Sequence, residues 1–371
     1  MPLPLELQRF LKAHHDTQVL SVLVEGASAD PSVRRHWRIE VLRGIADARA
    51  ALFHDAPPDR VRFDQCVARL MRHLPSGSTR LFTHGWAGFA SADGDEYVEV
   101  LTRDVEPSVT WTVGPRILPY LAAHDESVAL VALGDRHRLL AYQLSRGALT
   151  DLEGIESAAT SMPGTHMGGA PRVGFHVGTR GATQADAADR AAREAWHRHV
   201  TASVQRITQL AGDNLAIVIG GASETVSLLA DGLPDDLSTR VALAPALQVH
   251  ASRAEIVRVA GAAVGSLEAA RQRALLRQVE EASWSRGHGA LGAEAVARAL
   301  EVGAVDRLLV GRAFAHQHRA TAELLAQRTL LDGGEVEVAV PAVSAAVDEG
   351  AWGVAARLRF ARSPARALQT A

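Results

Sequence analysis

Gly178-Thr179-Arg180-Gly181-Ala182-Thr183-Gln184 leads directly into an Ala-rich run that continues without a break over residues 185–210. A second Gly-rich stretch, residues 165–172, lies just upstream. Thr183 is a good helix N-cap, and Asp186 would place a carboxylate in the first turn, where the helix dipole favours it. The pattern predicts a loop over residues 160–184 that feeds a long helix over residues 184–211.

The predicted helix has two different faces. Arginine and histidine side chains occupy much of one face, while apolar side chains recur at helical spacing at Ala192, Trp196, Val200, Val204, Ile207 and Leu210. One face is therefore expected to pack and the other to offer positive charge. A glycine-bearing loop before a helix suits an anionic partner such as phosphate, because unpaired backbone N–H groups point towards it. A solvated basic helix with a flexible entry loop explains the same pattern.

The first third of the chain combines helical patterns with short β-branched runs. Turn residues separate these runs, as a small sheet requires. The pattern predicts helices over residues 3–14, 32–53 and 60–74, a short helix within residues 114–123, and strands over residues 19–24, 80–84, 97–101 and 109–113.

The remainder alternates strands and helices. A hairpin pattern at residues 127–133 and 138–144, with a third strand over 147–152, precedes the loop and long helix. Apolar strands at 215–219 and 240–247 follow, and a helix between strands implies a crossover and a partly parallel sheet. The last third reads as helices over residues 253–282, 291–302 and 315–327, and strands over residues 305–310, 335–340 and 354–360.

This order predicts an α/β protein of three consecutive domains, with boundaries at residues 1–122, 123–250 and 251–371. The chain has 371 residues, of which 47% are hydrophobic and 22% charged, which suffices for several cores. Its formal net charge is -3, so any contact with nucleic acid must come from local clusters. Lys12 is the single lysine, and a GC-rich genome explains the arginine excess as well as phosphate binding does.

The N-terminal segment and the single cysteine indicate where in the cell the protein is expected. The single cysteine, Cys66, lies in a helical apolar pattern typical of a buried structural thiol. Charged residues interrupt the N-terminal segment, unlike a signal peptide, and no apolar run reaches about 18 residues. We expect a cytoplasmic protein without a membrane partner.

The common catalytic motifs are not found. His197 with His199 and His316 with His318 are two residues apart, which points them to different faces of a helix and predicts surface histidines instead of metal ligands. No nucleophile, histidine and acid stand at a recognisable triad spacing. Gly220-Gly221 follows a strand but lacks the third glycine of a dinucleotide motif. The sequence predicts neither a metal nor a cofactor.

The second two-thirds of the chain resembles the archaeal and eukaryotic peptide-chain release factor and Pelota family, in its bacterial branch of the Balon type. The resemblance lies in the joint order of five segments: residues from Arg180 onwards, residues 215–221, residues 253–282, the run Ala299-Leu300-Glu301-Val302-Gly303-Ala304-Val305 within residues 297–310, and residues 352–360.

This resemblance implies three α/β domains. The first would enter the decoding centre and the second the peptidyl-transferase centre. The last would be an α/β/α sandwich, like that of kink-turn-binding ribosomal proteins, that docks an EF-Tu-type translational GTPase. The implied partner is the ribosome, with contacts to A-site ribosomal RNA in mimicry of tRNA. The candidate RNA-binding residues are Arg172, Arg180, Gly181, Gln184, Arg190 and Arg193.

Two departures from the family pattern bear on activity. The family's catalytic Gly-Gly-Gln corresponds here to Arg180-Gly181-Ala182-Thr183-Gln184, where only Gly181 matches and the glutamine is displaced. The stop-codon-reading Asn-Ile-Lys-Ser loop is absent from the sequence. A ribosome-binding factor of the Pelota or Balon type, acting in hibernation or rescue without peptide release, is therefore the first hypothesis. The alternatives are a peptidyl-tRNA hydrolase that uses Gln184 and an RNA-binding protein outside the ribosome.

Overall fold

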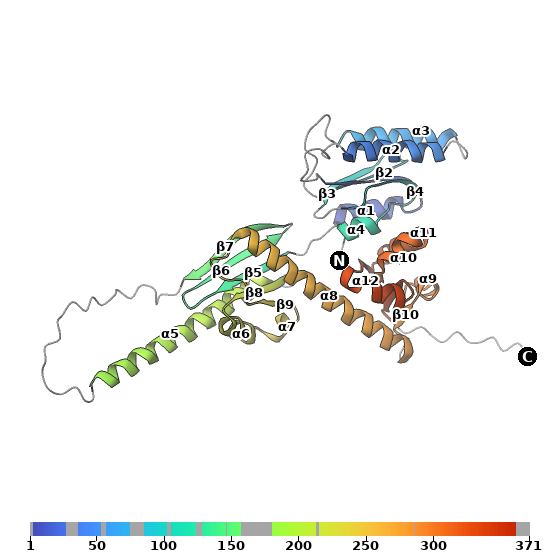
Figure 1. The fold of residues 1–371 in the computed structure, drawn as a ribbon. Helices are drawn as coiled ribbons and strands as arrows, with labels where there is room; N and C mark the ends of the chain where they lie inside the picture. Colours follow the sequence, from blue (N-terminus) through green and yellow to red (C-terminus); the bar gives the residue numbers. More distant parts are fainter. Residues whose placement is uncertain are drawn as a thin grey trace, which may run out of the picture. The chain divides into compact units, whose positions relative to one another are not determined.

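The computed structural model of the chain describes residues 3–26, 36–52, 57–74, 85–101, 105–123, 128–145, 147–156, 180–212, 215–285 and 287–360. These residues form three β-sheets with helices packed against them (Figure 1). Contacts divide the chain into two compact units, residues 1–125 with 269–371, and residues 126–268. The first unit contains a first module, residues 3–123, and a last module, residues 269–360. The second unit is the middle module.

The first module is an antiparallel sheet between two helical layers. Its strand order is β3 (Glu96–Leu101), β2 (Gly85–Ser91), β1 (Gln18–Glu25) and β4 (Ser108–Val113). In the central strand β1, Val19 and Leu23 face one core, and Leu20, Val22 and Val24 face the other, as the period of two requires. Helices α1 (Leu5–His14) and α4 (Leu118–Ala123) cover the first face, and α2 (His36–Ala51) and α3 (Pro57–Met71) cover the second.

One strand of this module was not predicted. The expected strand over residues 80–84 lies outside the described residues, and the strand of this region is β2, which the sequence analysis places in a turn. Glycines and small residues hide its pattern. Gly88 is required there, because a Cβ at this position would lie 2.2 Å from the ring of Trp86, which packs over it.

The middle module has a mixed five-stranded sheet in the order β7 (Ala148–Glu156), β6 (Arg138–Ser145), β5 (Ala129–Gly134), β8 (Ala216–Gly221) and β9 (Val241–Ala244). The predicted hairpin is present, and β5, β8 and β9 are parallel, which confirms the partly parallel sheet. Helices α5 (Arg180–Ala211), α6 (Ser223–Asp231) and α7 (Asp235–Ser238) pack on one face. The first part of α8 (Arg253–Ser285) packs on the other.

The last module is a three-layer α/β/α arrangement. Its sheet has the order β10 (Gly289–Leu291), β13 (Val354–Leu358), β11 (Val305–Val310) and β12 (Glu335–Val338). Helices α9 (Ala293–Glu301) and α11 (Arg319–Leu331) cover one face. The second part of α8, α12 (Pro341–Ala345) and the π-helical turn η3 (Ala346–Gly350) cover the other.

One predicted helix of this module is wrong. Residues 315–327 are not a single helix, because the backbone leaves helical geometry at His318, with φ −112° and ψ 45°, between α10 (Arg312–Gln317) and α11. The predicted α/β class, with several sheets, is confirmed. The contact division falls within α8, at residues 268 and 269, while the domain boundaries 1–122, 123–250 and 251–371 stay a prediction.

Candidate nucleic-acid interface

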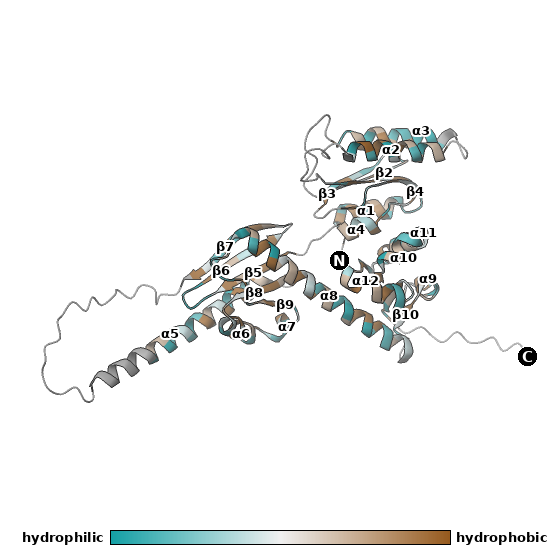
Figure 2. Ribbon diagram, in the orientation of Figure 1, coloured by the Kyte–Doolittle hydropathy of each residue, from teal (hydrophilic) through white to brown (hydrophobic). Residues whose placement is uncertain are grey.

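The C-terminal part of α5 anchors this helix to the middle module. Four of its residues, one turn apart, are buried: His199, Ser203, Ile207 and Ala211. Val200, Val204 and Leu210 pack beside them against the sheet. Figure 2 shows the change from mixed hydropathy in the described N-terminal part of α5 to apolar residues at this base. The predicted apolar stripe is therefore correct from Val200 onwards, but Ala192 is exposed and Trp196 is only half-buried.

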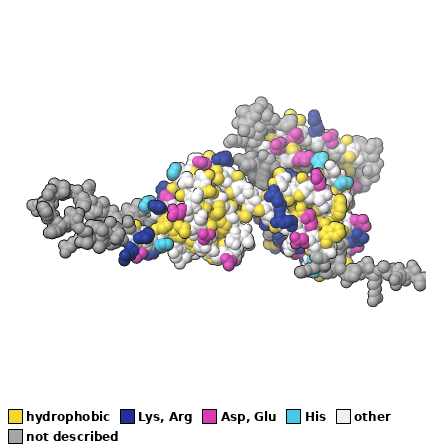
Figure 3. Space-filling view, turned by 60° about the horizontal axis from the view of Figure 1, so that its bottom comes forward, with side chains coloured by type: hydrophobic (Ala, Val, Ile, Leu, Met, Phe, Trp, Pro, Cys, Tyr) yellow, Lys and Arg dark blue, Asp and Glu magenta, His cyan; other side chains and the backbone are white. Residues whose placement is uncertain are grey.

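Before this base, α5 is a charged and exposed helix. No side chain from Arg190 to Arg198 is buried, and the segment contains three arginines and one glutamate. Arg190, Arg193 and His197 follow one another at three- and four-residue spacing, so they share one face of the helix. Figure 3 shows basic and histidine side chains gathered over this part of the middle module. The arrangement presents guanidinium groups to solvent, where they can contact an anionic backbone.

Arg206, another basic residue of the predicted charged face, is committed to its own module. Its Nη2 lies 3.2 Å from the Glu153 carboxylate in β7, and its Nε donates to the Glu153 carbonyl at 3.1 Å. This pair ties α5 to the edge strand of the sheet. Arg190 and Arg193 lie further from the base, and both are exposed.

The base of α5 contains a polar feature that the sequence analysis missed. His199 and Ser203 are buried, and the His199 Nδ1 and Ser203 Oγ atoms have no hydrogen-bond partner among the described residues. Burial lowers the pKa of His199, against the opposing effects of Asp135 and of the backbone at Arg138. The signal was available, because residues 199, 203, 207 and 211 stand at the four-residue spacing of a buried helix face.

Asp135 organises the hairpin turn that faces His199. Its Oδ1 accepts hydrogen bonds from the backbone N–H groups of His137, at 2.7 Å, and Arg138, at 2.9 Å. Burial acts to raise the pKa of Asp135, but these two hydrogen bonds and the charge of Arg138 outweigh it and lower the pKa. The turn between β5 and β6 is therefore held by a charged carboxylate near the α5 base.

The predicted helix start is wrong. Helix α5 begins at Arg180, so Thr183 is not its N-cap and Asp186 is not in its first turn. Arg180, Gly181 and Gln184, expected at the tip of a loop, lie on helical backbone at the start of α5. The Ala-rich composition explains the extension, since nothing between Arg180 and Thr183 stops a helix strongly enough to outweigh it. Arg172, with residues 157–179, lies outside the described residues.

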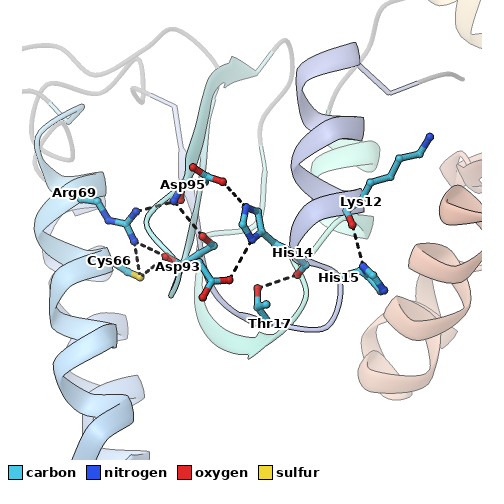
Figure 4. A network of polar contacts seen from close by, with 9 residues as sticks. Lys12, His14, His15, Thr17, Cys66, Arg69, Asp93 and Asp95 are labelled. Atoms are coloured by element: carbon cyan, nitrogen blue, oxygen red, sulfur yellow. Dashed lines mark hydrogen bonds and ion pairs between the residues drawn. The ribbon is translucent and has the colours of Figure 1, made fainter.

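A second polar cluster lies in the first module and fixes the turn between β2 and β3 (Figure 4). His14 Nε2 is 2.8 Å from an Asp95 carboxylate oxygen, and His14 Nδ1 is 3.6 Å from Asp93. Arg69 donates to the carbonyls of Ser91 and Asp95, and to the Cys66 Sγ at 3.1 Å. The cluster joins α1, α3 and the turn into one rigid group.

Cys66 is a structural thiol, as the sequence predicted. It is buried, it donates to the Ser91 carbonyl at 3.3 Å, and burial raises the pKa of its thiol despite Arg69. A cleft of about 540 Å³ beside it is lined by Gln65, Ala68, Arg69, Arg72, Ala92, Asp93 and Gly94. Arg69, one of the residues that line this cleft, is engaged by backbone carbonyls.

Among the described residues, no three histidine, cysteine, aspartate or glutamate side chains come together in a way that could hold a metal ion. Within the same ranges, no helix combines the length and apolar character needed to cross a bilayer. Of the predicted RNA-binding residues, the structure places Arg190 and Arg193 together on one exposed face of α5, with His197 beside them.

Comparison with known proteins identifies the class. Residues 115–264 match the family described as bacterial archaeo-eukaryotic release factor family 10. This range contains the α4 helix, the whole middle sheet, α5 and the first part of α8. This part of the chain is therefore similar to bacterial release factors of the archaeo-eukaryotic type, in agreement with the predicted resemblance. Within that class, it carries the bacterial family 10 region over residues 115–264.

Several solved structures match the chain at low sequence identity. The archaeal translation termination factor aRF1 is 14% identical, with 96% of each chain covered and a TM-score of 0.26. A ribosome-bound archaeal Pelota with ABCE1 is 12% identical over 98% of this chain and 96% of that one, with a TM-score of 0.39. Dom34 of S. cerevisiae is 11% identical over 76% of this chain and 80% of that one, with a TM-score of 0.43. Among curated proteins, none matches the chain in sequence.

Proposed function

We propose that this protein is a cytoplasmic, ribosome-binding translation factor that occupies the A site in hibernation or rescue without releasing the nascent peptide. The observation that carries the proposal is the exposed, arginine-bearing part of α5 within the release factor family region. A helix whose base is packed and whose residues from Arg190 to Arg198 are charged and not buried is suited to reaching ribosomal RNA.

The proposed RNA contacts begin with Arg190 and Arg193. Both are exposed on one face of α5, and each can donate two parallel hydrogen bonds to phosphate oxygens. Arg172, Arg180, Gly181 and Gln184 are proposed contacts from the segment before and at the start of the helix. Such contacts release counterions from RNA, so binding is expected to weaken steeply as salt rises.

The absence of peptide release is proposed from the sequence of the Arg180 to Gln184 segment. It lacks the family's Gly-Gly-Gln triplet, and its backbone belongs to a helix. The first amide groups of a helix have no partner within it, so the missing triplet, and not the helical backbone, is the basis of this part of the proposal. The alternative, peptidyl-tRNA hydrolysis by Gln184, needs this segment to unwind.

The proposed partners follow from the family match. These are ribosomal RNA of the A site, near the decoding and peptidyl-transferase centres, and an EF-Tu-type translational GTPase that docks on the last module. The first module would face the decoding centre. Mimicry of tRNA by the whole chain is part of the same proposal.

Cosedimentation with ribosomes tests the proposal. The wild-type chain is expected to pellet at low salt and to be lost at high salt, and complete failure to pellet at any salt would overturn the proposal. Charge reversal of both Arg190 and Arg193 to Glu should reduce the slope of log affinity against log salt by about 2. Arg258→Glu, an exposed arginine on α8, is the matched control and should leave the slope unchanged.

Two further assays separate the alternatives. Peptidyl-tRNA on loaded ribosomes should stay intact in the presence of the wild-type chain. Release that disappears in Gln184→Ala would establish the hydrolase instead. Crosslinking in cells should recover ribosomal RNA as the main target, and recovery of mostly other RNA would favour a function outside the ribosome.

A further inference from the structure

Side chains of helix α11, in the last module, form hydrogen bonds to the backbone of residues 114–118, near the end of the first module. The Gln327 Nε2 donates to the Pro115 carbonyl at 2.8 Å. About one helical turn earlier in α11, the Glu323 Oε2 accepts the backbone N–H of Ile117 at 2.9 Å and that of Leu118 at 3.2 Å. These contacts join residues more than 200 positions apart in sequence and satisfy the N–H groups at the start of α4.

The same segment contributes to two hydrophobic cores. Ile117 and Tyr120 are buried in the core of the first module with α1 and β1. Leu118 is buried in the core of the last module with α9 and α11. Because neighbouring side chains of one short segment enter different cores, this segment helps to join the two modules.

Gly114 allows the close approach of α11. Its φ is +73°, and a Cβ at this position would lie 2.5 Å from the Gln327 side-chain oxygen. An alanine would therefore be strained by its backbone conformation and would also displace the amide that holds Pro115. The contact between Gln327 and residues 114–115 thus depends on a glycine at this point.

Among the residues that the structure describes, no cation is hydrogen-bonded to Glu323 to compensate its burial. The side chains of Arg116 and Glu323 are 10% and 13% exposed, and the Arg116 Nε lies 3.8 Å from the Glu323 Oε1, too far for a hydrogen bond. Arg116 Nε is also a buried atom without a hydrogen-bond partner. The Ile117 and Leu118 N–H groups lie nearest to Oε2, and the Leu118 N–H also lies 3.3 Å from Oε1. A proton on Oε1 would therefore displace only this longest of the three contacts.

The electrostatics agree with this geometry. Burial raises the pKa of Glu323 to about 7, although the N–H groups of Leu118 and Ile117 and the charges of Arg116 and Arg319 act to lower it. Burial likewise lowers the pKa of Arg116, helped by the like charge of Arg319 and opposed by Glu323 and Glu106. The charged groups that face the carboxylate are therefore Arg116 from the 114–118 segment and Arg319 from α11.

We propose that Glu323 and Gln327 form a latch that joins the last module to the first through residues 114–118, and that engagement of the latch takes up a proton. The proposal concerns contacts within one compact unit and does not depend on ribosome binding. It makes the union of the two modules sensitive to pH near neutrality.

The direction of the pH effect follows from linkage. In the released state, Glu323 is in water and titrates near its ordinary pKa of 4.5, whereas in the engaged state its pKa is about 7. Between these values the engaged state binds more protons, so acidification favours engagement and a rise of pH through 7 favours release. Below both values, and well above both, the dependence disappears.

Hydrogen exchange of the backbone amides of residues 116–121 in the full chain tests the latch. After correction for the intrinsic pH dependence of exchange, opening of this segment in the wild type should increase tenfold to a hundredfold, on the order of the linkage expected for this pKa difference, from pH 5 to pH 8. Amides of β1, in the centre of the first module's sheet, report global unfolding and serve as the internal reference.

Three variants decide the outcome. Glu323→Gln retains an oxygen for the N–H groups but cannot titrate, so protection of residues 116–121 should persist without the pH dependence. Glu323→Ala should lose the protection at every pH. Glu301→Gln, an exposed carboxylate on α9, should behave as the wild type. Protection that is independent of pH in the wild type, or equally dependent on pH in Glu323→Gln, would overturn the proposal.

Discussion

Two helices of nearly equal length, α5 with 32 residues and α8 with 33, use their surfaces in opposite ways. On α8, buried residues recur along the whole helix, at Ile256, Ala260, Val264, Ala269, Gln272, Leu275, Leu276 and Val279. On α5, the described side chains before His199 include no buried residue. Both helices are rich in alanine and arginine, so composition does not distinguish a helix that is covered by a core from one that is exposed.

The two helices differ in the source of their stability. An isolated helical segment in water depends on propensity and local pairs, whereas a packed helix gains most of its stability from the apolar surface it buries. The exposed part of α5 can therefore change its side chains with little effect on folding. Such tolerance is expected of a surface used for binding, and not of α8.

Matched prolines give the largest expected difference between the two helices. Ala263→Pro interrupts α8 where it packs on the middle module, and should lower the free energy of unfolding by about 3 kcal/mol or more. Ala192→Pro lies in the exposed part of α5, where it should remove local helix without shifting the global unfolding midpoint. Chemical denaturation followed by circular dichroism measures both. Equal destabilisation by the two prolines would contradict the comparison.

Truncation within the α8 stripe should have the next largest effect. Ile256 is 1% exposed in the core of the middle module, and Ile256→Ala should cost about 2–4 kcal/mol because it removes buried methylene groups and leaves a cavity. Leu243→Ala, at a residue that is 52% exposed in β9, is the control and should change stability by less than about 0.5 kcal/mol. A cost below about 1 kcal/mol for Ile256→Ala would show that α8 is not held by this stripe.

The two helices also show which features the sequence could predict. Residues 253–282 predicted α8 to within its last turn, because a regular pattern of small and apolar residues runs along its whole length. The start of α5 was misplaced, because Thr183 is a good N-cap locally, but the Ala-rich run that follows it favours a helix that extends back to Arg180. Local signals of similar strength compete at helix ends, and the sequence does not say which prevails.

The remaining errors have a different origin. Strand β2 was missed because Gly88 is there to make room for Trp86, a contact between residues on one face that no propensity records. The contacts of Glu323 with Ile117 and Leu118 join positions that are 206 and 205 residues apart, so they could not be found from local pattern. Of the candidate RNA-binding residues, the sequence identified the exposed pair Arg190 and Arg193 correctly as surface residues, while their RNA contacts stay a prediction.

The base of α5 should respond to acid through His199. Burial holds the pKa of His199 below its ordinary value of 6.5, so the folded state favours the neutral ring. The stabilisation is complete above pH 6.5 and is lost as the pH falls below it, because the unfolded state then binds the proton more strongly. Thermal unfolding of the wild type between pH 7 and pH 5 should show this loss, and His199→Leu should reduce it.

His197, two residues earlier on the same helix, is exposed and provides the matched control. His197→Leu should leave the pH dependence of the melting temperature as in the wild type. If the two leucine variants show the same pH dependence, His199 is not the group that couples the α5 base to acid.

The smallest expected effect is a gain of stability in α8. Gly265 is an interior helical residue, and a Cβ at this position would meet nothing within 4 Å. Gly265→Ala should therefore raise the free energy of unfolding by about 0.5–1 kcal/mol, since alanine favours helix and restricts the unfolded chain without a clash. Gly303→Ala is the informative control, because a Cβ there also meets nothing within 4 Å but its φ is +65°. That substitution should cost about 1 kcal/mol, so opposite signs for the two alanines in chemical denaturation would separate helix propensity from backbone strain. A loss of stability in Gly265→Ala would mean that α8 does not keep regular helical geometry at this position in solution.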